Sequence, residues 1–206
     1  MIRTTRRTAL QLALLCLAAP SALARQKPSA TDWRTSLVDA ARRQVGVTTL
    51  YDSTYVRLAY PGGDVAPDRG VCTDVVVRAY RRAFGLDLQK LVHEDMAANF
   101  SAYPKAWGLK APDSNIDHRR VPNLAVFFSR RGASLPVSED PAEYQPGDLV
   151  TQMLPGNLTH IAIVSSNHSA QAPERPLVIH NIGWGAREED TLFAFRQTGR
   201  FRFAPA

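Results

Sequence analysis

Two cysteines occur in the chain, at positions 16 and 72, and we expect only Cys72 to remain after export. Cys16 lies within an apolar leader that a signal peptidase would remove. An unpaired cysteine in an exported protein indicates an intermolecular disulfide or a reactive thiol. The alternative is a small buried apolar residue, which is a common role for a free cysteine. Composition alone leaves both roles open, so the surroundings of Cys72 must decide between them.

Cys72 stands at the first position of a predicted helix, directly after Gly70 and Val71. The backbone N–H groups of a first helical turn lack partners within the helix, and the helix dipole adds partial positive charge there. A thiolate is favoured at such a position, so we predict a lowered pKa for the thiol. The same N–H groups could stabilise the oxyanion that forms when the thiolate attacks a carbonyl. We expect Asp74 to cap this helix or, alternatively, to orient a neighbouring side chain.

Two histidines are predicted to meet through a β-hairpin. His160 opens one apolar strand, and His180 stands near the end of the next. If the strands pair antiparallel, the start of the first lies beside the end of the second, and both imidazoles reach the same sheet edge. One imidazole would then act as base toward Cys72, while the other would hold its tautomer. Asn181 is the competing orienter, but neighbouring residues face opposite sides of a strand, so His180 and Asn181 cannot both serve.

A dense polar run, Asn115–Arg120, contains His118, Arg119 and Arg120. Its simplest interpretation is a solvated loop. The functional alternative is recognition of a substrate carboxylate, because the guanidinium of arginine offers a bidentate fork.

Cys72, His160 and His180 could alternatively bind zinc, since sulfur and nitrogen are its preferred ligands. No close-spaced ligand pair of the CxxC or HExxH type accompanies them. We therefore predict a site without a metal ion or other cofactor.

The elements that must position these residues fall into two groups. Apolar residues at helical spacing predict three helices in the first half of the chain, and shorter apolar runs predict strands in the second half. Helices followed by strands indicate an α+β fold with an antiparallel sheet. The predicted helices cover about Thr31–Gln44, Cys72–Phe84 and Leu88–Asn99, and the predicted strands cover Leu124–Phe128, Leu149–Met153, His160–Ser165, Leu177–Asn181, Thr191–Phe195 and Arg200–Phe203.

Residues 1–24 have the composition of a secretory signal peptide. They contain three arginines and no acid, an apolar run from Ala9 to Ala19, and a small-x-small cleavage site ending at Ala24. This run is too short for a stable membrane-spanning helix, and we predict a periplasmic or secreted protein without a membrane anchor. Residues 25–206 are predicted to form a single domain.

The net charge of +6 falls to +3 without the three leader arginines. The remaining basic residues form short pairs, whereas nucleic-acid binding needs a clustered basic stripe, so we expect no nucleic-acid partner.

The order of these motifs resembles the NlpC-type cell-wall peptidases of the papain-like superfamily. The stretches that carry the resemblance are Cys72 at a helix start, Gly147-Asp148-Leu149-Val150, His160-Ile161-Ala162-Ile163-Val164 and Val178-Ile179-His180. The resemblance implies a papain-like fold, in which N-terminal helices pack on a small antiparallel β-sheet. It also implies that Cys72 is the nucleophile, His160 the base and His180 the third polar residue.

Two features depart from the NlpC-type pattern. Those enzymes usually carry Asp-Cys-Ser at the nucleophile, where this chain has Val71-Cys72-Thr73. They often place a tyrosine before the nucleophile to help the oxyanion site. Tyr51, Tyr55 and Tyr60 are candidates for this tyrosine, and Tyr60 is also a candidate supporting residue of the site.

The chain also resembles an uncharacterised secreted bacterial family, the YijF-like family, over most of its mature part. The matching stretches are Tyr60-Pro61-Gly62-Gly63-Asp64, Gly70-Val71-Cys72-Thr73-Asp74, Leu91-Val92-His93-Glu94-Asp95-Met96, Ile116-Asp117-His118-Arg119-Arg120-Val121-Pro122-Asn123-Leu124 and His180-Asn181-Ile182-Gly183.

These observations predict an exported thiol hydrolase of peptide or amide bonds, with peptidoglycan stem peptides as the expected substrate. An acyltransferase or lipid hydrolase built on the same groups is a second possibility, because the same nucleophile and base can act on other acyl donors. A wall-binding or zinc-binding module without catalysis is the third.

Overall fold

The computed structural model describes residues 30–205, and the predicted leader, residues 1–24, lies outside them. Within this range, helices pack on a six-stranded antiparallel sheet, so the α+β class is confirmed. The helices are α1 (Ala30–Arg42), α2 (Cys72–Phe84), α3 (Leu88–Ala98) and α4 (Val121–Arg130). The sheet has the order β3-β8-β4-β5-β6-β7, formed by Ser134–Leu135, Arg196–Phe201, Leu149–Leu154, Leu158–His168, Pro176–Asn181 and Ala186–Glu189.

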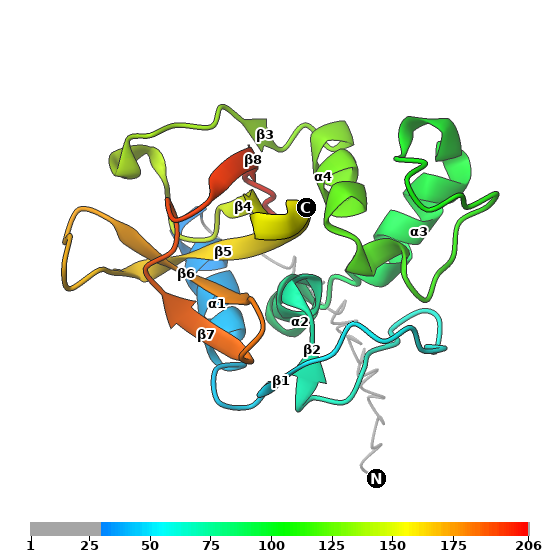
Figure 1. Ribbon diagram of the computed structural model, residues 1–206, viewed down its shortest axis with the longest axis horizontal. Helices are drawn as coiled ribbons and strands as arrows, with labels where there is room; N and C mark the ends of the chain where they lie inside the picture. Colours follow the sequence, from blue (N-terminus) through cyan, green and yellow to red (C-terminus); the bar gives the residue numbers. More distant parts are fainter. Residues whose placement is uncertain (1–29, 206) are drawn as a thin grey trace, which may run out of the picture.

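Helix α2 occupies the middle of the molecule, with the sheet and α1 on one side and α3 and α4 on the other (Figure 1). Its buried apolar side chains recur at helical spacing, and Val75, Val76, Ala79 and Tyr80 are fully buried. Gly85 ends the helix in the left-handed conformation (φ 67°), which glycine adopts without steric cost. The predicted helix from Cys72 to Phe84 is therefore confirmed at both ends.

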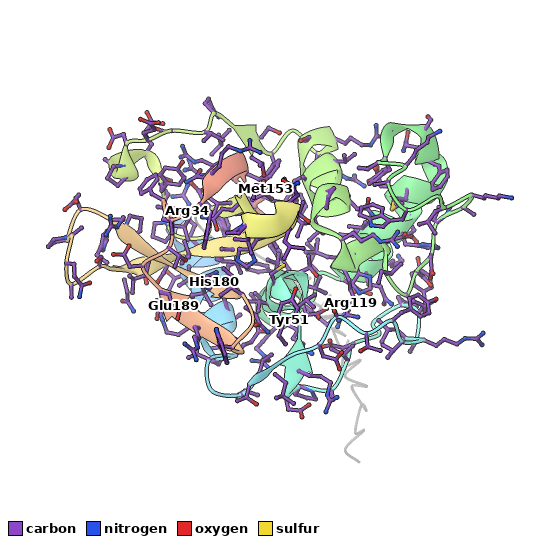
Figure 2. The ribbon with its side chains drawn as sticks, viewed as in Figure 1. Arg34, Tyr51, Arg119, Met153, His180 and Glu189 are labelled. Carbon is purple, nitrogen blue, oxygen red and sulfur yellow. The ribbon has the colours of Figure 1, made fainter. Side chains whose placement is uncertain are left out.

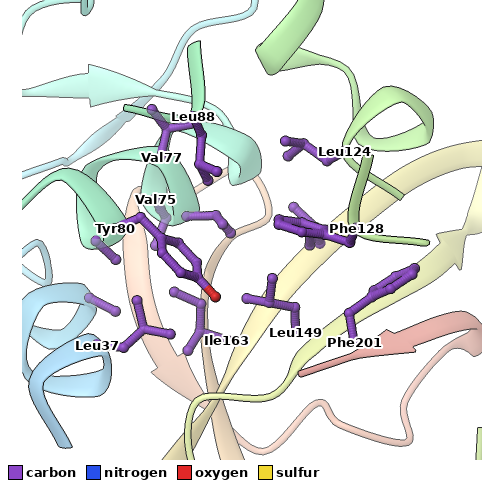
Figure 3. Packing of buried hydrophobic residues seen from close by; sticks show 14 of the residues in the cluster. Leu37, Val75, Val77, Tyr80, Leu88, Leu124, Phe128, Leu149, Ile163 and Phe201 are labelled. Atoms are coloured by element: carbon purple, nitrogen blue, oxygen red, sulfur yellow. The ribbon is translucent and has the colours of Figure 1, made fainter. Parts of the chain in front are cut away.

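The sheet presents two different apolar faces. Ile161, Ile163 and Ile179 pack into the core with α1 and α2, part of which is seen in Figure 3. The residues between them, such as Ala162 and Val178, belong to a second cluster with Tyr144 and Leu192 on the opposite face. Strand alternation thus places odd and even residues of β5 in separate environments. Because both faces of the sheet are covered, the buried residues Ile161–Val164 of β5 are all apolar and do not alternate with polar residues.

The predicted strand Leu124–Phe128 is wrong, because these residues lie in helix α4. Val121, Leu124, Phe127 and Phe128 are the buried residues on one side of that helix, and Pro122 stands in its first turn, where proline is tolerated. A short apolar run does not distinguish a buried strand from a buried helix. The helical spacing becomes visible only when the segment is extended back to Val121.

The predicted strand Thr191–Phe195 is also wrong. These residues form the connection between β7 and β8, where Leu192 is buried and Phe193 contacts the ring of Tyr144. The strand preceding this connection is β7, whose sequence Ala-Arg-Glu-Glu has no apolar pattern. Strand β7 forms because its backbone pairs with β6 at the sheet edge, not because its side chains favour a strand.

The predicted elements that correspond to α1, α3, β4, β5 and β6 are confirmed with small shifts of their ends. The predicted strand Arg200–Phe203 overlaps β8 only at Arg200 and Phe201, because β8 begins earlier, at Arg196. The long segment 46–70 contains two short strands, β1 (Leu50–Tyr51) and β2 (Arg69–Gly70), which pair in parallel. This pairing places Tyr51 beside Gly70, two residues before Cys72. None of the described helices combines the length and apolar character needed to cross a bilayer.

Candidate active site

Cys72 is the first residue of α2 and is 5% exposed. Backbone N–H groups of Ile161, Thr73 and Cys72 itself favour the thiolate. Burial outweighs them and, with a contribution from the Asp74 carboxylate, raises the pKa of the thiol to about 11. The predicted lowering of this pKa is therefore wrong, because the helix start stabilises the anion less than dehydration destabilises it.

His160 and His180 meet as the hairpin predicted. Nε2 of His160 lies 2.8 Å from Nδ1 of His180, and the rings stand edge to face. The strand register, in which Ile163 pairs with Ile179, sets His180 opposite Ala162, so the two imidazoles are diagonal neighbours on one face. Both side chains are buried. Burial lowers the pKa of His160 to about 3, with a smaller contribution from His180.

Glu189 extends this pair and was not found by sequence reasoning. Its Oε2 lies 3.1 Å from Nε2 of His180, and this contact partly offsets the lowering of the pKa of His180 by burial. Alternation along β7 separates the two glutamates, since Glu188 binds Arg42 of α1 while Glu189 faces His180. Sequence reasoning missed Glu189 because the polar sequence of β7 (Ala186–Glu189) gives no sign that this segment pairs with β6.

The hydrogen-bond chain determines which nitrogen atoms carry protons. The Glu189 carboxylate accepts a hydrogen bond, so Nε2 of His180 donates and Nδ1 of His180 must accept. Nε2 of His160 is then the donor to His180, which leaves a lone pair on Nδ1 of His160. The backbone of the next residue, Ile161, donates its N–H to the Cys72 thiol. The strand that carries His160 therefore also contacts the thiol, through the backbone of the following residue.

Asn181 faces away from the histidine pair. Its Nδ2 donates to the carbonyl oxygen of Gly70 at 2.9 Å, and its Oδ1 accepts from the backbone of Gly183. His180, and not Asn181, therefore contacts His160. The amide of Asn181 instead attaches the chain just before Cys72 to the end of β6.

Asp74 does not contact either histidine of this pair. One of its carboxylate oxygens accepts from the Val71 backbone at 2.7 Å, which caps the start of α2. The carboxylate also forms a buried, two-point ion pair with Arg119, with both N–O distances 3.0 Å. The capping role predicted for Asp74 is confirmed, and Asp74 also orients a neighbouring side chain, that of Arg119.

A cavity of about 220 Å³ opens beside Cys72, between the start of α2 and the loop that leads into α4. Residues from both sides line it, among them Tyr51, Arg119, Arg120, Trp107 and Thr159. Figure 2 shows Tyr51 and Arg119 beside α2, with His180 and Glu189 on the sheet side.

Two residues named from sequence lie elsewhere. Tyr60 stacks edge-on against His93, with ring centroids 5.0 Å apart, so Tyr51 is the tyrosine of the Cys72 cavity. Burial is the main cause that raises the pKa of Tyr51, and the neighbouring Cys72 adds to it. His118 is buried behind the cavity, where dehydration lowers its pKa to about 4.

No group of three or more His, Cys, Asp and Glu side chains within residues 30–205 is arranged to hold a metal ion. Cys72, His160 and His180 therefore do not form a ready zinc site in this structure. The nitrogen that faces His180 is already engaged in the imidazole pair.

The candidate active site therefore combines a cysteine at a helix start with a histidine pair and a carboxylate on the adjoining sheet. The chain matches the family described as "Domain of unknown function (DUF1287)" over residues 38–203 and belongs to that family. It is 55% identical over 168 residues to "Uncharacterized protein YijF" of Escherichia coli (strain K12), which covers 82% of this chain and 80% of the relative. The resemblance to an uncharacterised YijF-like family is thereby confirmed, and the family match contains Cys72, His160, His180 and Glu189.

Proposed function

We propose that this protein is an exported thiol hydrolase that cleaves peptide or amide bonds. The observation that carries the proposal is the hydrogen-bond chain Glu189–His180–His160, which ends on β5 one residue before Ile161, whose backbone N–H contacts the thiol of Cys72. A nucleophile, a base and an orienting group are the parts that covalent acyl transfer requires. The cavity at Cys72 supplies access for a substrate carbonyl.

The mechanism begins from a neutral pair, because burial raises the pKa of Cys72 and lowers that of His160. The thiol attacks the substrate carbonyl as its proton passes to Nδ1 of His160, so His160 acts as general base. His160 then gives this proton to the leaving amine, which releases the first product and leaves a thioester on Cys72. Water attacks the thioester with the same base, and the thiol is regenerated with release of the carboxylic acid.

The proposed reaction develops negative charge on the substrate oxygen and positive charge on His160, and protein groups lie near both. The N–H groups at the start of α2 face the thiol region and would stabilise the oxyanion, and the Tyr51 hydroxyl could add a donor from across the cavity. The imidazolium that forms at His160 is stabilised through His180 by the Glu189 carboxylate. Cys72 and His160 are the catalytic residues, and His180 and Glu189 are positioning residues.

We further propose that the fold is papain-like and of the NlpC type. The supporting features are a nucleophile at the start of a central helix, an antiparallel sheet packed on that helix, and histidines on two adjacent strands. The missing acid before the cysteine has a local explanation, since Asp74 after it is used to cap α2 and bind Arg119. This difference concerns the cavity wall rather than the nucleophile and base.

Peptidoglycan stem peptides are the proposed substrate. The predicted export signal would deliver the protein to the compartment where this amide polymer is abundant. Arg120 in the cavity wall suits a substrate with carboxylate groups. The protein would then be periplasmic or secreted, and its partner would be the cell wall.

The proposal is tested by digesting purified sacculi with the wild-type protein and with Cys72→Ala, and by identifying released fragments by mass spectrometry. We expect the variant to lose activity by about 10⁴-fold or more, on the scale seen when triad nucleophiles are removed. Matching melting temperatures would show that the variant folds. Equal fragment patterns from both proteins would refute the proposal, and release of acids from lipid esters alone would favour the lipid hydrolase.

A further inference from the structure

Arg119 and Arg120 are consecutive, and both line the cavity at Cys72, but their guanidinium groups have different surroundings. Arg119 is 2% exposed in its side chain and binds Asp74 at two points. Its other donor contacts are to the backbone carbonyls of Asp52 and Thr54. Its charge and donors are therefore satisfied inside the protein, which leaves little capacity for a ligand.

Arg120 lies against an aromatic ring instead of a carboxylate. Its Cζ is 4.1 Å from the ring centroid of Trp107, a side chain that is 40% exposed. The Nη1 atom of Arg120 is buried and has no hydrogen-bond partner among the residues that the structure describes. A guanidinium can stack through its face and still donate hydrogen bonds in its plane. Trp107 thus orients the fork of Arg120 without using its donors.

Two acidic residues, Asp113 and Asp117, act on the charge of Arg120 without a close contact, and Oδ1 of Asp117 itself lacks a hydrogen-bond partner among the described residues. Asp113 accepts a hydrogen bond from Tyr55, and Asp117 contacts His93 at 2.9 Å. Within residues 30–205, no ion pair of 4.0 Å or less joins either acid to Arg120. Burial lowers the pKa of Arg120, as expected for a cation that has lost water without a close counter-ion. A dehydrated donor without a partner costs free energy that a bound anion would recover.

We propose that Arg120 and Trp107 form a subsite that binds a free carboxylate of the substrate beside the bond attacked by Cys72. This inference rests on the proposed function, because it assigns the cavity a role in recognising a peptide. Arginine pairs with a carboxylate through two parallel hydrogen bonds, and stacking on Trp107 restricts the orientation of the fork. The substrate class is then an acidic peptide, such as a stem peptide whose glutamyl and diaminopimelyl residues retain carboxylates outside the amide bonds.

The test measures binding without turnover, in the chain carrying Cys72→Ala. The probes are the tripeptide alanyl-γ-glutamyl-diaminopimelate and the same tripeptide with its free carboxylates amidated, each titrated by calorimetry. We expect the amidated tripeptide to bind about 10-fold to 100-fold more weakly, the range for a lost hydrogen bond to a charged group. Arg120→Gln should weaken binding of the acidic tripeptide by a similar factor and leave the amidated one unchanged.

Two further variants separate recognition from folding. Arg120→Lys keeps the charge but loses the fork, so its affinity should lie between wild type and Arg120→Gln. Arg131→Gln is the matched control, because Arg131 also stacks on an aromatic ring, that of Phe127, but lies outside the Cys72 cavity. It should bind both tripeptides as the parent does.

Equal affinity for the acidic and amidated tripeptides would overturn the subsite, and so would failure of the acidic tripeptide to bind. These outcomes are independent of the sacculus assay. A carboxylate preference without turnover of sacculi by the wild type would support the subsite and contradict the hydrolase. Turnover with equal binding of both tripeptides would do the reverse.

Discussion

The sheet and the loop that leads into α4 both contact α2, and they satisfy their buried polar groups in opposite ways. On the sheet side, Glu189, His180 and His160 form a continuous chain in which each bond has a donor and an acceptor. On the loop side, Arg119 is fully engaged with Asp74, but its neighbour Arg120 keeps a buried nitrogen without a partner in the part of the chain that the structure describes. Both sides are built from polar residues in a largely dehydrated setting, so composition does not explain the difference.

The difference matters because groups that carry out a reaction and groups that bind a ligand have different requirements. The proposed base, His160, must already hold the correct tautomer when the substrate arrives, and the contacts with His180 and Glu189 fix that tautomer with protein groups alone. A binding group must keep donors available, and the loop side leaves them on Arg120. Cys72 lies between the two, as a member of the helix that both sides contact.

The largest expected effect comes from breaking the satisfied ion pair on the loop side. Asp74→Asn leaves the Arg119 guanidinium buried without a counter-ion and weakens the cap on α2. We expect the free energy of unfolding to fall by about 3–5 kcal/mol, the range for removing one member of a buried pair. Urea denaturation of wild type and variant measures this difference. Asp95→Asn is the control, because its partners Arg130 and Arg131 are partly exposed and can be hydrated.

A loss below about 1 kcal/mol in Asp74→Asn would mean that Arg119 finds water when its partner is removed, as surface ion pairs do. Arg119 and Arg120 would then differ less in their access to water than their contacts indicate. A double variant that replaces both Asp74 and Arg119 with apolar residues should recover part of the lost stability.

The second expected effect concerns the thiol that lies between the two sides. Because burial raises its pKa to about 11, little thiolate is present near neutral pH in the free protein. We expect iodoacetamide to alkylate Cys72 at pH 8 about 100-fold more slowly than an exposed cysteine, with a rate that still rises with pH above pH 9. Mass spectrometry of the time course at several pH values measures this rate.

A rate that levels off below pH 7 would instead indicate a preformed thiolate–imidazolium pair. His160→Ala distinguishes the two cases, since it would slow alkylation at neutral pH only if such a pair exists. For the neutral pair proposed here, His160→Ala should leave the alkylation rate nearly unchanged while it abolishes hydrolysis.

The smallest of these effects comes from shortening the chain on the sheet side. Glu189→Gln replaces the terminal acceptor with an amide that can also donate, so the proton order at His180 and His160 is no longer unique. We expect kcat to fall by about 10-fold to 100-fold, as for other groups that orient a reacting side chain, with KM nearly unchanged. Steady-state kinetics on a peptide fragment of the wall measures both constants.

Glu188→Gln is the matched control for this prediction, because Glu188 lies next to Glu189 but binds Arg42 on the far side of β7. A fall in kcat of equal size in both variants would show that strand β7 acts through stability alone. A specific loss in Glu189→Gln, together with a changed pH dependence of kcat, would identify Glu189 as a positioning residue.

Several parts of the site follow from local sequence. Cys72 begins a helix because the apolar spacing of Val75, Val76 and Ala79 determines where that helix runs. His160 and His180 share a face because strand alternation and a hairpin of two consecutive apolar strands leave few other pairings. The error at Leu124–Phe128 arose in the same way, since a short apolar run satisfies both helix and strand patterns.

Other parts depend on contacts between distant segments. Glu189 becomes a partner of His180 because β7 adds to the sheet edge through backbone bonds, which leave no trace in its polar sequence. Tyr51 rather than Tyr60 reaches the cavity because β1 pairs with β2 beside Gly70.

By itself, the sequence determined that Cys72 begins a helix, that His160 and His180 share a sheet face, and the order of the elements that carry them, because helix and strand periodicity are local properties. Only the tertiary structure decided how the charged residues are used. Arg119 and Arg120 are the same residue type at adjacent positions, yet one closes an ion pair with Asp74 and the other stacks on Trp107. The direction of the Cys72 pKa shift was decided in the same way, since it depends on how much water the assembled cavity excludes and not on the helix start alone.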